Sequence, residues 1–224
     1  MKKIIITILL VLSMTFTTVS QMWAGGYGYG DYMWVDNGDE ATIIGYFAQS
    51  GDINIPEVIP KDNKEYKVTA IGNGAFEYSS CDGRLVIPNQ ITTIGQGAFI
   101  SCDKLNGSLE LPSGLTQIEK ETFAYCSGFT GILSLPQGIT SIGERAFGGC
   151  SGFTGELSIP SEVKDIGDFA FYGCTGVSGE ILLPDSVQSI GEYTFGACDG
   201  VSCVSIPSGV TEIGQNAFSN CEGL

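Results

Sequence analysis

Residues 133–150 read LSLPQGITSIGERAFGGC, and residues 157–174 repeat the pattern as LSIPSEVKDIGDFAFYGC. In each copy an Ile-Gly pair is preceded by a Pro, six residues before the Ile, and followed by a Phe, five residues after it. This Ile occurs in seven copies, spaced by 23 or 24 residues: Ile71, Ile94, Ile118, Ile142, Ile166, Ile190 and Ile213. A fixed period of this length predicts a solenoid, in which each repeat forms one coil.

The pattern within one copy predicts how a coil is built. Apolar residues two apart in the L-x-[L/I]-P segment predict a short strand that ends at the Pro. A second extended piece follows around ITSIG (139–143), and a short helical turn over A-F-x-x-C places the Phe inside. Burying about six large apolar side chains per coil is worth roughly 9–18 kcal/mol. Ordering the backbone costs more, at about 1–2 kcal/mol per residue, so a coil is stable only when stacked on its neighbours.

Glycine follows the repeat Ile in six of the seven copies, and Glu119 takes its place in the seventh. A positive φ would explain the glycine, and so would a close approach between coils. If a positive φ is required, Glu119 carries strain of about 1 kcal/mol or more. The sequence leaves both explanations open.

The cysteines follow the same period. Cys81 lies five residues after its Phe, and Cys203 lies outside the register. Eight cysteines in an exported chain favour disulfides, but equivalent side chains of stacked coils point in parallel into the core. We therefore predict reduced, buried thiols, with one disulfide involving Cys203 or Cys81 as the alternative. No C-x-x-C pair is present, which argues against a zinc site. The predicted structural ladder lies three residues after the repeat Phe: Cys102, Cys126, Cys150, Cys174, Cys198 and Cys221.

Residues 1–24 have the pattern of a secretory signal peptide, with Lys2 and Lys3 before an apolar stretch and small residues near the end. The apolar stretch spans roughly nine residues, well short of the ~20 that a membrane-spanning helix needs. We therefore expect a secreted or extracellular cell-surface protein whose mature chain does not insert into a membrane.

Residues 25–52 are predicted to form a flexible leader, GGYGYG (25–30), and a β-hairpin that caps the first coil. Asp36-Asn37-Gly38-Asp39 supplies the hairpin turn signal. The solenoid takes in residues 53–224 and ends within a repeat, and its first repeat holds an insertion within 57–68.

Composition excludes several classes of function. With 25 acidic against 10 basic residues the net charge is −15, and it becomes −17 without Lys2 and Lys3. This charge opposes nucleic-acid binding. The absence of His excludes a Ser-His-Asp centre. The carboxylate pairs Asp165 with Asp168 and Glu119 with Glu121 lack counterparts in neighbouring repeats, so we interpret them as surface charge and expect no cofactor or metal.

Aromatic residues at outward-facing positions are the candidate ligand-binding residues. Phe169 and Tyr193 lie two residues before the core Phe of adjacent coils, and Tyr172 and Tyr125 follow it. Exposed aromatic rings favour recognition, although these rings could instead cover the turns of their own coils. A second candidate surface is the outward strand positions, which are small and polar and suit a flat contact: Glu110, Ser134, Ser158, Leu182 and Ser205.

The combination of I-G-x-x-A-F-x-x-C with L-x-I-P over residues 53–224 resembles the BspA-type leucine-rich repeat. The resemblance implies an α/β solenoid, mostly of short strands and turns, wound right-handedly into about seven coils with the hairpin as cap. It also implies export by a host-associated bacterium and a non-enzymatic role in protein binding or adhesion. The expected partner is then a host matrix or plasma protein or another cell surface. The alternatives are a glycan-binding accessory module and, less favoured, a carbohydrate-active parallel β-helix enzyme.

Overall fold

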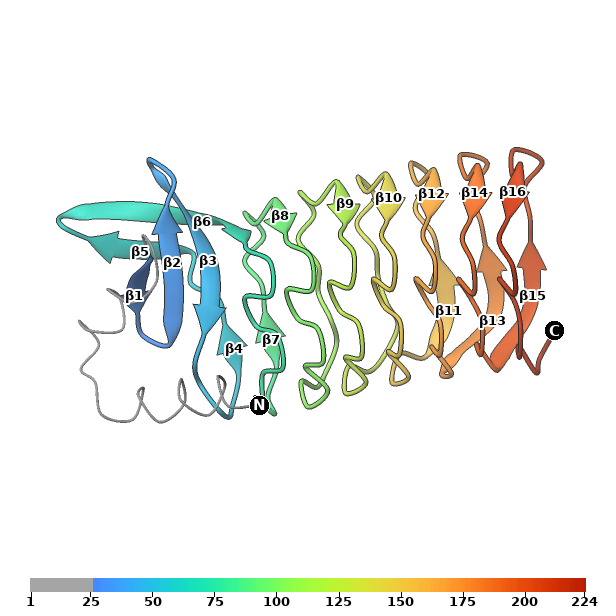
Figure 1. The fold of residues 1–224 in the computed structure, drawn as a ribbon, viewed down its shortest axis with the longest axis horizontal. Coiled ribbons are helices and arrows are strands. Elements are labelled where there is room, and N and C mark those ends of the chain that lie inside the picture. Colours follow the sequence, from blue (N-terminus) through green and yellow to red (C-terminus); the bar gives the residue numbers. More distant parts are fainter. Residues whose placement is uncertain (1–25) are drawn as a thin grey trace.

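The computed structural model describes residues 26–224 as a row of stacked coils with a β-sheet cap at one end (Figure 1). The predicted signal peptide, residues 1–24, lies outside the described residues. The described residues form strands and turns and contain no helix. The strands are β1 (Tyr27–Tyr29), β2 (Tyr32–Asp36), β3 (Glu40–Tyr46), β4 (Ile53–Asn54), β5 (Val58–Lys61), β6 (Lys64–Ile71), β7 (Leu85–Val86), β8 (Thr93–Ile94), β9 (Gln117–Ile118), β10 (Ser141–Ile142), β11 (Gly155–Ser158), β12 (Asp165–Ile166), β13 (Val177–Leu182), β14 (Ser189–Ile190), β15 (Gly200–Ser205) and β16 (Glu212–Ile213).

The repeat Ile residues lie directly over one another. Strands β9, β10, β12, β14 and β16 pair in parallel, and each Ile pairs with the Ile of the next coil, as Ile142 does with Ile166. On the opposite side, β11, β13 and β15 form a second parallel sheet. The prediction of stacked coils is therefore confirmed.

The repeat Phe residues form a continuous column inside the coils. From Phe76 to Phe218, consecutive ring centroids lie 4.8–5.6 Å apart, with interplanar angles of 2–13°. Phe123, Phe147 and Phe171 are fully buried. Each ring thus covers its neighbours in an offset stack, which adds about 0.5–1.5 kcal/mol per pair to the burial of apolar surface.

The segment from the repeat Ile to the Cys does not form the predicted helical turn. Alternate N–H groups in this segment donate to carbonyls of the next coil, as Arg145 does to Asp168 and Phe147 does to Ala170, both at 2.8 Å. Within this segment the backbone has a positive φ at two positions of every coil, three and seven residues after the Ile. The intervening N–H groups donate three residues back within the segment, as Gly148 does to Arg145 at 3.1 Å. Bonds between coils thus alternate with bonds within the turn, and no continuous helical run forms. We call this side of the solenoid, from two to seven residues after each repeat Ile, the turn edge.

The glycine after the repeat Ile is explained by close approach. No glycine at this position has a positive φ within residues 26–224. A Cβ on Gly167 would lie 2.7 Å from the backbone N of Glu144, and its N–H donates to Ile142 at 2.8 Å. At Glu119 the equivalent bond to Ile94 is missing, and pairing between β8 and β9 is interrupted in the described structure. A side chain at this position therefore separates two coils.

The cysteine thiols lie in a column beside the Phe rings. Each of the six thiols in register donates a hydrogen bond to the carbonyl of the Phe in the preceding coil, with Sγ–O distances of 3.0–3.3 Å. All eight cysteines are free thiols in the structure. Cys81 is buried, whereas Cys203 is exposed. The ladder therefore consists of thiol–carbonyl contacts between coils, and neither alternative disulfide is present among the described residues.

The cap is larger than the predicted hairpin. Strands β2 and β3 form that hairpin, but Tyr27–Tyr29 also pairs antiparallel with β2 and is not a flexible leader. Alternating tyrosines explain this pairing, because Tyr27 packs on Trp34 with the ring centroids 5.1 Å apart. The insertion within 57–68 forms a second hairpin, β5–β6, whose turn residues Asp62 and Asn63 have positive φ. The parallel pairing of β3 with β6 joins the cap to the first coil.

Candidate functional site

Three of the four predicted aromatic residues meet on the turn edge. The rings of Phe169 and Tyr193 stack with centroids 5.0 Å apart and an interplanar angle of 11°. Tyr172 packs edge-on against both rings, at 5.6 Å from Phe169 and 6.1 Å from Tyr193. We call these three residues the aromatic patch. Tyr172 is the most open of them, with 38% of its surface exposed, while Phe169 and Tyr193 are half-buried.

The stacking of Phe169 and Tyr193 follows from their register. Both lie three residues after the repeat Ile, at the first left-handed position of adjacent coils. This position is glycine in Gly74 and Gly97, which adopt the same backbone conformation. A bulky residue with positive φ is a conformational outlier. The fold therefore does not require an aromatic side chain at this position.

Charged residues continue the patch toward the cap. Arg145 occupies the same register as Phe169, and its guanidinium carbon lies 4.6 Å from the Phe169 ring centroid, a cation–π contact. Arg145 also contacts Glu144 and lies 3.9 Å from Glu121. Lys120 donates to Glu144 at 2.7 Å, and this hydrogen bond raises the pKa of the Lys120 ammonium. The patch thus borders a network of two cations and two carboxylates.

Tyr125 does not join the patch. It lies seven residues after Ile118, at the second left-handed position, and 53% of its surface is exposed. Its ring lies over Gly149 of the next coil, where an added Cβ would come within 2.7 Å of the ring. Tyr78 occupies the equivalent position two coils earlier and is 69% exposed.

The predicted surface carboxylates make contacts between coils. Asp168 accepts a bond from the backbone N–H of Glu192 at 2.7 Å, and Asp165 accepts one from the Ser189 hydroxyl at 3.0 Å. These contacts give Asp165 and Asp168 a structural role. Within residues 26–224, no group of three or more His, Cys, Asp or Glu side chains is arranged to hold a metal ion.

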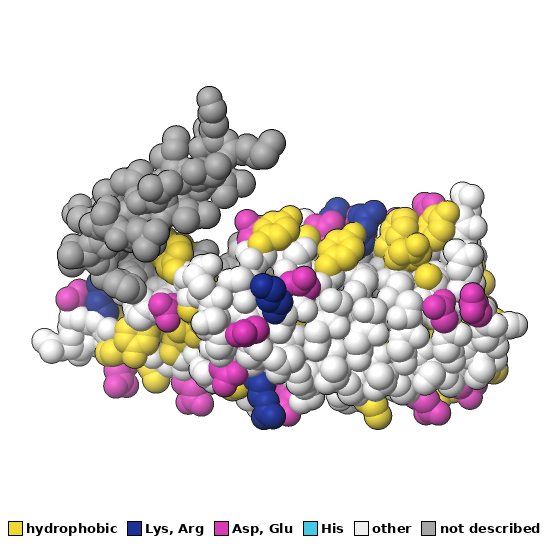
Figure 2. All heavy atoms as spheres, turned by 90° about the horizontal axis from the view of Figure 1, so that it is seen from below, with side chains coloured by type: hydrophobic (Ala, Val, Ile, Leu, Met, Phe, Trp, Pro, Cys, Tyr) yellow, Lys and Arg dark blue, Asp and Glu magenta, His cyan; other side chains and the backbone are white. Residues whose placement is uncertain are grey.

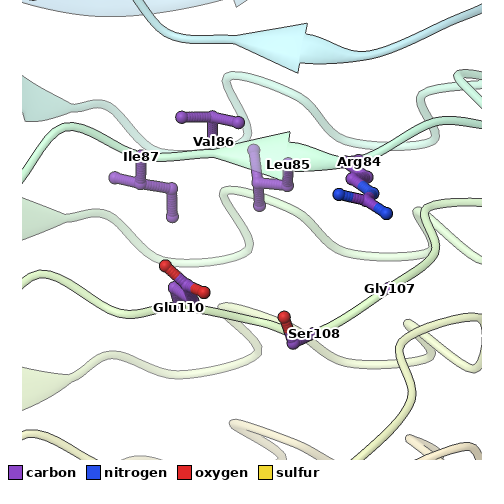
Figure 3. Close-up of a pocket in the computed structure, with 7 residues that line it drawn as sticks. All are labelled: Arg84, Leu85, Val86, Ile87, Gly107, Ser108 and Glu110. Atoms are coloured by element: carbon purple, nitrogen blue, oxygen red, sulfur yellow. The ribbon is translucent and has the colours of Figure 1, made fainter.

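On the face opposite the turn edge, a shallow hollow of about 260 Å³ lies where the second and third coils meet (Figure 3). Arg84 stands at one end and Glu110 at the other, with Ser108 between them, and Val86 is also part of the lining. Of the outward strand positions predicted as a contact surface, only Glu110 contributes to it. Leu182, another of those positions, is half exposed and lies outside this hollow.

Four thiols of the ladder are held protonated by burial. Burial raises the pKa of Cys174 to about 12 and raises the pKa values of Cys126, Cys150 and Cys198 well above the ordinary range. A protonated thiol is a poor nucleophile. These four thiols therefore contribute packing and hydrogen bonds rather than nucleophilic chemistry.

Two functional candidates were missed from the sequence alone, although the register contains a signal for each. Arg145 is the residue two before the core Phe, as Phe169 is, so its place beside that ring follows from the stacking. Tyr78 lies seven residues after its Ile, as Tyr125 does. Comparing the residues three and seven positions after the Ile in all seven repeats identifies both Arg145 and Tyr78.

Comparisons with known proteins agree with the geometry. The model of the BspA type Leucine rich repeat region matches residues 69–175 and 131–224, with six copies. A leucine-rich repeat protein from Bacteroides ovatus has a TM-score of 0.79 and 28% identity, over 88% of this chain and 51% of that one. One from T. pallidum has a TM-score of 0.73 and 28% identity, over 86% of both chains. A leucine rich cell surface protein from Faecalibacterium prausnitzii has a TM-score of 0.59 and 26% identity, over 89% and 53%.

This chain therefore spans about half the length of the Bacteroides ovatus protein. No curated protein matches the chain. Within residues 26–224 there is no helix of the length and apolarity that crossing a bilayer requires. The family model covers more than half of the sequence, and the stacked coils are those of its structural relatives. The chain belongs to the BspA type leucine-rich repeat family.

Proposed function

We propose that this protein is an exported, non-enzymatic binding protein that recognises a protein partner through the aromatic patch, in adhesion to host or neighbouring cells. The family and the solved relatives are leucine-rich repeat proteins, and one of those relatives is described as a cell surface protein. Export rests on the signal-peptide pattern of residues 1–24. The expected partner is a matrix or plasma protein or a protein of another cell surface.

The proposal rests mainly on the contact between three aromatic rings on the turn edge. Other coils have glycine at the position of Phe169 and Tyr193, so the fold itself does not require aromatic side chains there. Phe169, Tyr172 and Tyr193 present a rigid, partly exposed surface beside the guanidinium of Arg145. Aromatic residues and Arg are enriched among the residues that dominate protein–protein binding energy. The solenoid holds these side chains in place before a partner arrives, which lowers the entropy lost on binding.

Charge adds to the expected specificity. The chain carries a net charge of −15, and acidic residues outnumber basic ones by more than two to one. Complementary charge speeds association and excludes partners of like charge. The preferred partner therefore presents an apolar or aromatic contact within a basic surface, and its binding weakens as the salt concentration rises.

Binding of plasma and extracellular-matrix proteins to the immobilised protein tests this proposal. The test variant combines Phe169→Gly with Tyr193→Asn, because Gly97 and Asn216 occupy the same register with the same backbone conformation. The control is Tyr29→Ser, which removes an exposed aromatic ring from the cap. We expect the variant to bind at least about tenfold more weakly while the control binds as the wild type does.

Three outcomes contradict the proposal. Equal binding by the wild type and the double variant would remove the aromatic patch from the interface. If the wild-type protein bound none of the proteins tested, matrix and plasma proteins would be excluded as its partners. An equal loss of binding in Tyr29→Ser would place the contact on the cap.

A further inference from the structure

A slot opens on the turn edge between Tyr78 and Tyr125, nearer the cap than the aromatic patch. Both tyrosines occupy the second left-handed position of their coils, with φ of 56° and 62°. The coil between them has the small residue Ser101 at this position, with φ of 58°. Tyr78 and Tyr125 are the two most exposed aromatic side chains of residues 26–224. Figure 2 shows hydrophobic side chains along one edge of the solenoid, some standing apart and others gathered in a cluster.

The spacing of the two tyrosine backbones follows from the rise of the coils. Two coils rise about 9.6 Å, twice the ~4.8 Å between neighbouring strands. A flat aromatic group touching both tyrosine rings would need only about 7–8 Å, since carbon atoms in contact lie about 3.5–4.0 Å apart. A puckered, saturated six-membered ring is thicker than a flat one and suits the larger spacing between the two backbones better. The cavity between the two tyrosines measures about 400 Å³.

Polar side chains line the rest of the slot: Ser79, Ser80, Ser101, Asp103 and Lys104. The side chains of Ser101, Asp103 and Lys104 take part in no hydrogen bond or ion pair found within residues 26–224. A hydroxyl, a carboxylate and an ammonium group therefore remain available, and together they donate and accept hydrogen bonds. An apolar wall combined with a few convergent polar groups is typical of a small-ligand site.

We propose that the slot between Tyr78 and Tyr125 binds one pyranose unit of a neutral glycan. The two rings cover the C–H faces of the sugar, while Ser101, Asp103 and Lys104 engage its hydroxyl groups. The net charge of −15 opposes sulphated and carboxylated glycans. This inference goes beyond the proposed protein-binding function, because it uses different residues in different coils.

The tyrosines are dispensable for the fold, which makes the proposal testable. Gly149 and Gly173 occupy the same register in later coils, with φ of 78° and 71°. Glycine suits this backbone conformation better than tyrosine does. The variants Tyr78→Gly and Tyr125→Gly are therefore expected to fold as the wild type does, so that any loss of binding reports the side chain itself.

The test uses a printed array of neutral and sulphated oligosaccharides, probed with the full chain. Any neutral glycan that binds is then titrated by calorimetry against the wild type, Tyr78→Gly, Tyr125→Gly and Phe169→Gly. We expect each tyrosine variant to bind at least about tenfold more weakly, and Phe169→Gly to bind as the wild type does. Saturation-transfer NMR is expected to show the strongest contacts at the ring C–H groups of the sugar.

The outcomes separate this proposal from the preceding one. Unchanged affinity in both tyrosine variants would overturn the slot, as would a preference for sulphated glycans or the absence of any neutral glycan that binds. A loss confined to Phe169→Gly would move the sugar to the aromatic patch and also overturn it. Failure of the protein-partner experiment leaves this result unaffected, because Tyr78 and Tyr125 are unchanged in that double variant.

Discussion

The thiol ladder makes the stability of the solenoid fall at alkaline pH. An unfolded cysteine ionises with a pKa of about 8.5, whereas burial holds the pKa of Cys174 at about 12 and raises those of Cys126, Cys150 and Cys198. Above pH 8.5 the unfolded chain therefore binds fewer protons than the folded chain. The free energy of unfolding must then decrease as the pH rises.

The size of the effect follows from the number of buried thiols. Each thiol lowers the free energy of unfolding by about 1.4 kcal/mol per pH unit above 8.5. Between pH 8.5 and 10 this amounts to about 2 kcal/mol per thiol, and to about 8 kcal/mol for the four. A typical domain is stable by only about 5–15 kcal/mol, so we expect the solenoid to be close to unfolding at pH 10.

Urea unfolding followed by circular dichroism, at half-unit steps from pH 7 to 10 in the presence of a reducing agent, measures this slope. Cys150→Ala is expected to make the slope shallower by up to one proton. Cys203→Ala removes an exposed thiol and is expected to leave the slope unchanged. A free energy of unfolding that is constant from pH 8.5 to 10, or a slope that Cys150→Ala does not alter, would refute the reasoning.

Three further predictions concern the packing between coils. Gly167→Ala, which puts a Cβ 2.7 Å from backbone, is expected to cost about 2–4 kcal/mol and to lower the melting temperature by about 4–16 °C. Gly138→Ala is the control: its new Cβ would lie 3.5 Å from the nearest atom, so its melting temperature is expected to equal that of the wild type. Equal melting temperatures for the two variants would contradict the close approach of backbone at Gly167. Glu119→Gly is expected to restore the bond to Ile94, seen as slower amide hydrogen exchange at residue 119; unchanged exchange would contradict this. In the native protein iodoacetamide is expected to modify Cys203 first, and mass spectrometry showing equally fast modification of Cys150 would contradict the ladder.

The period of the sequence was enough to predict most of the fold. Because coils of equal length stack in register, the positions of Ile142, Phe147 and Cys150 within one repeat determined the columns of the whole array. The same argument correctly brought Phe169 next to Tyr193. Where the prediction depended on local pattern alone it failed: in the A-F-x-x-C segment, bonds to the next coil alternate with bonds three residues back, and no helix forms.

Other features depend on contacts that a single repeat does not contain. Tyr27–Tyr29 looks like a flexible glycine-rich leader, and it is ordered because it pairs with β2 of the cap. The sequence left the role of the repeat glycine open because it does not give the distance between coils. That distance leaves no room for a Cβ, which explains why β8 and β9 do not pair where Glu119 replaces the glycine. Tyr125 stands alone because the next coil has Gly149 at its position, so that no second ring meets it.

Nuclear Overhauser contacts between phenylalanine rings test the stacking on which the aromatic patch and the tyrosine slot both depend. With the rings selectively labelled, we expect Phe147 to show cross-peaks to both Phe123 and Phe171, whose centroids lie 5.6 and 5.5 Å away. We expect no cross-peak between Phe123 and Phe171, which are separated by the ring of Phe147. Absence of the two contacts to Phe147, or a direct contact between Phe123 and Phe171, would contradict the stacked coils.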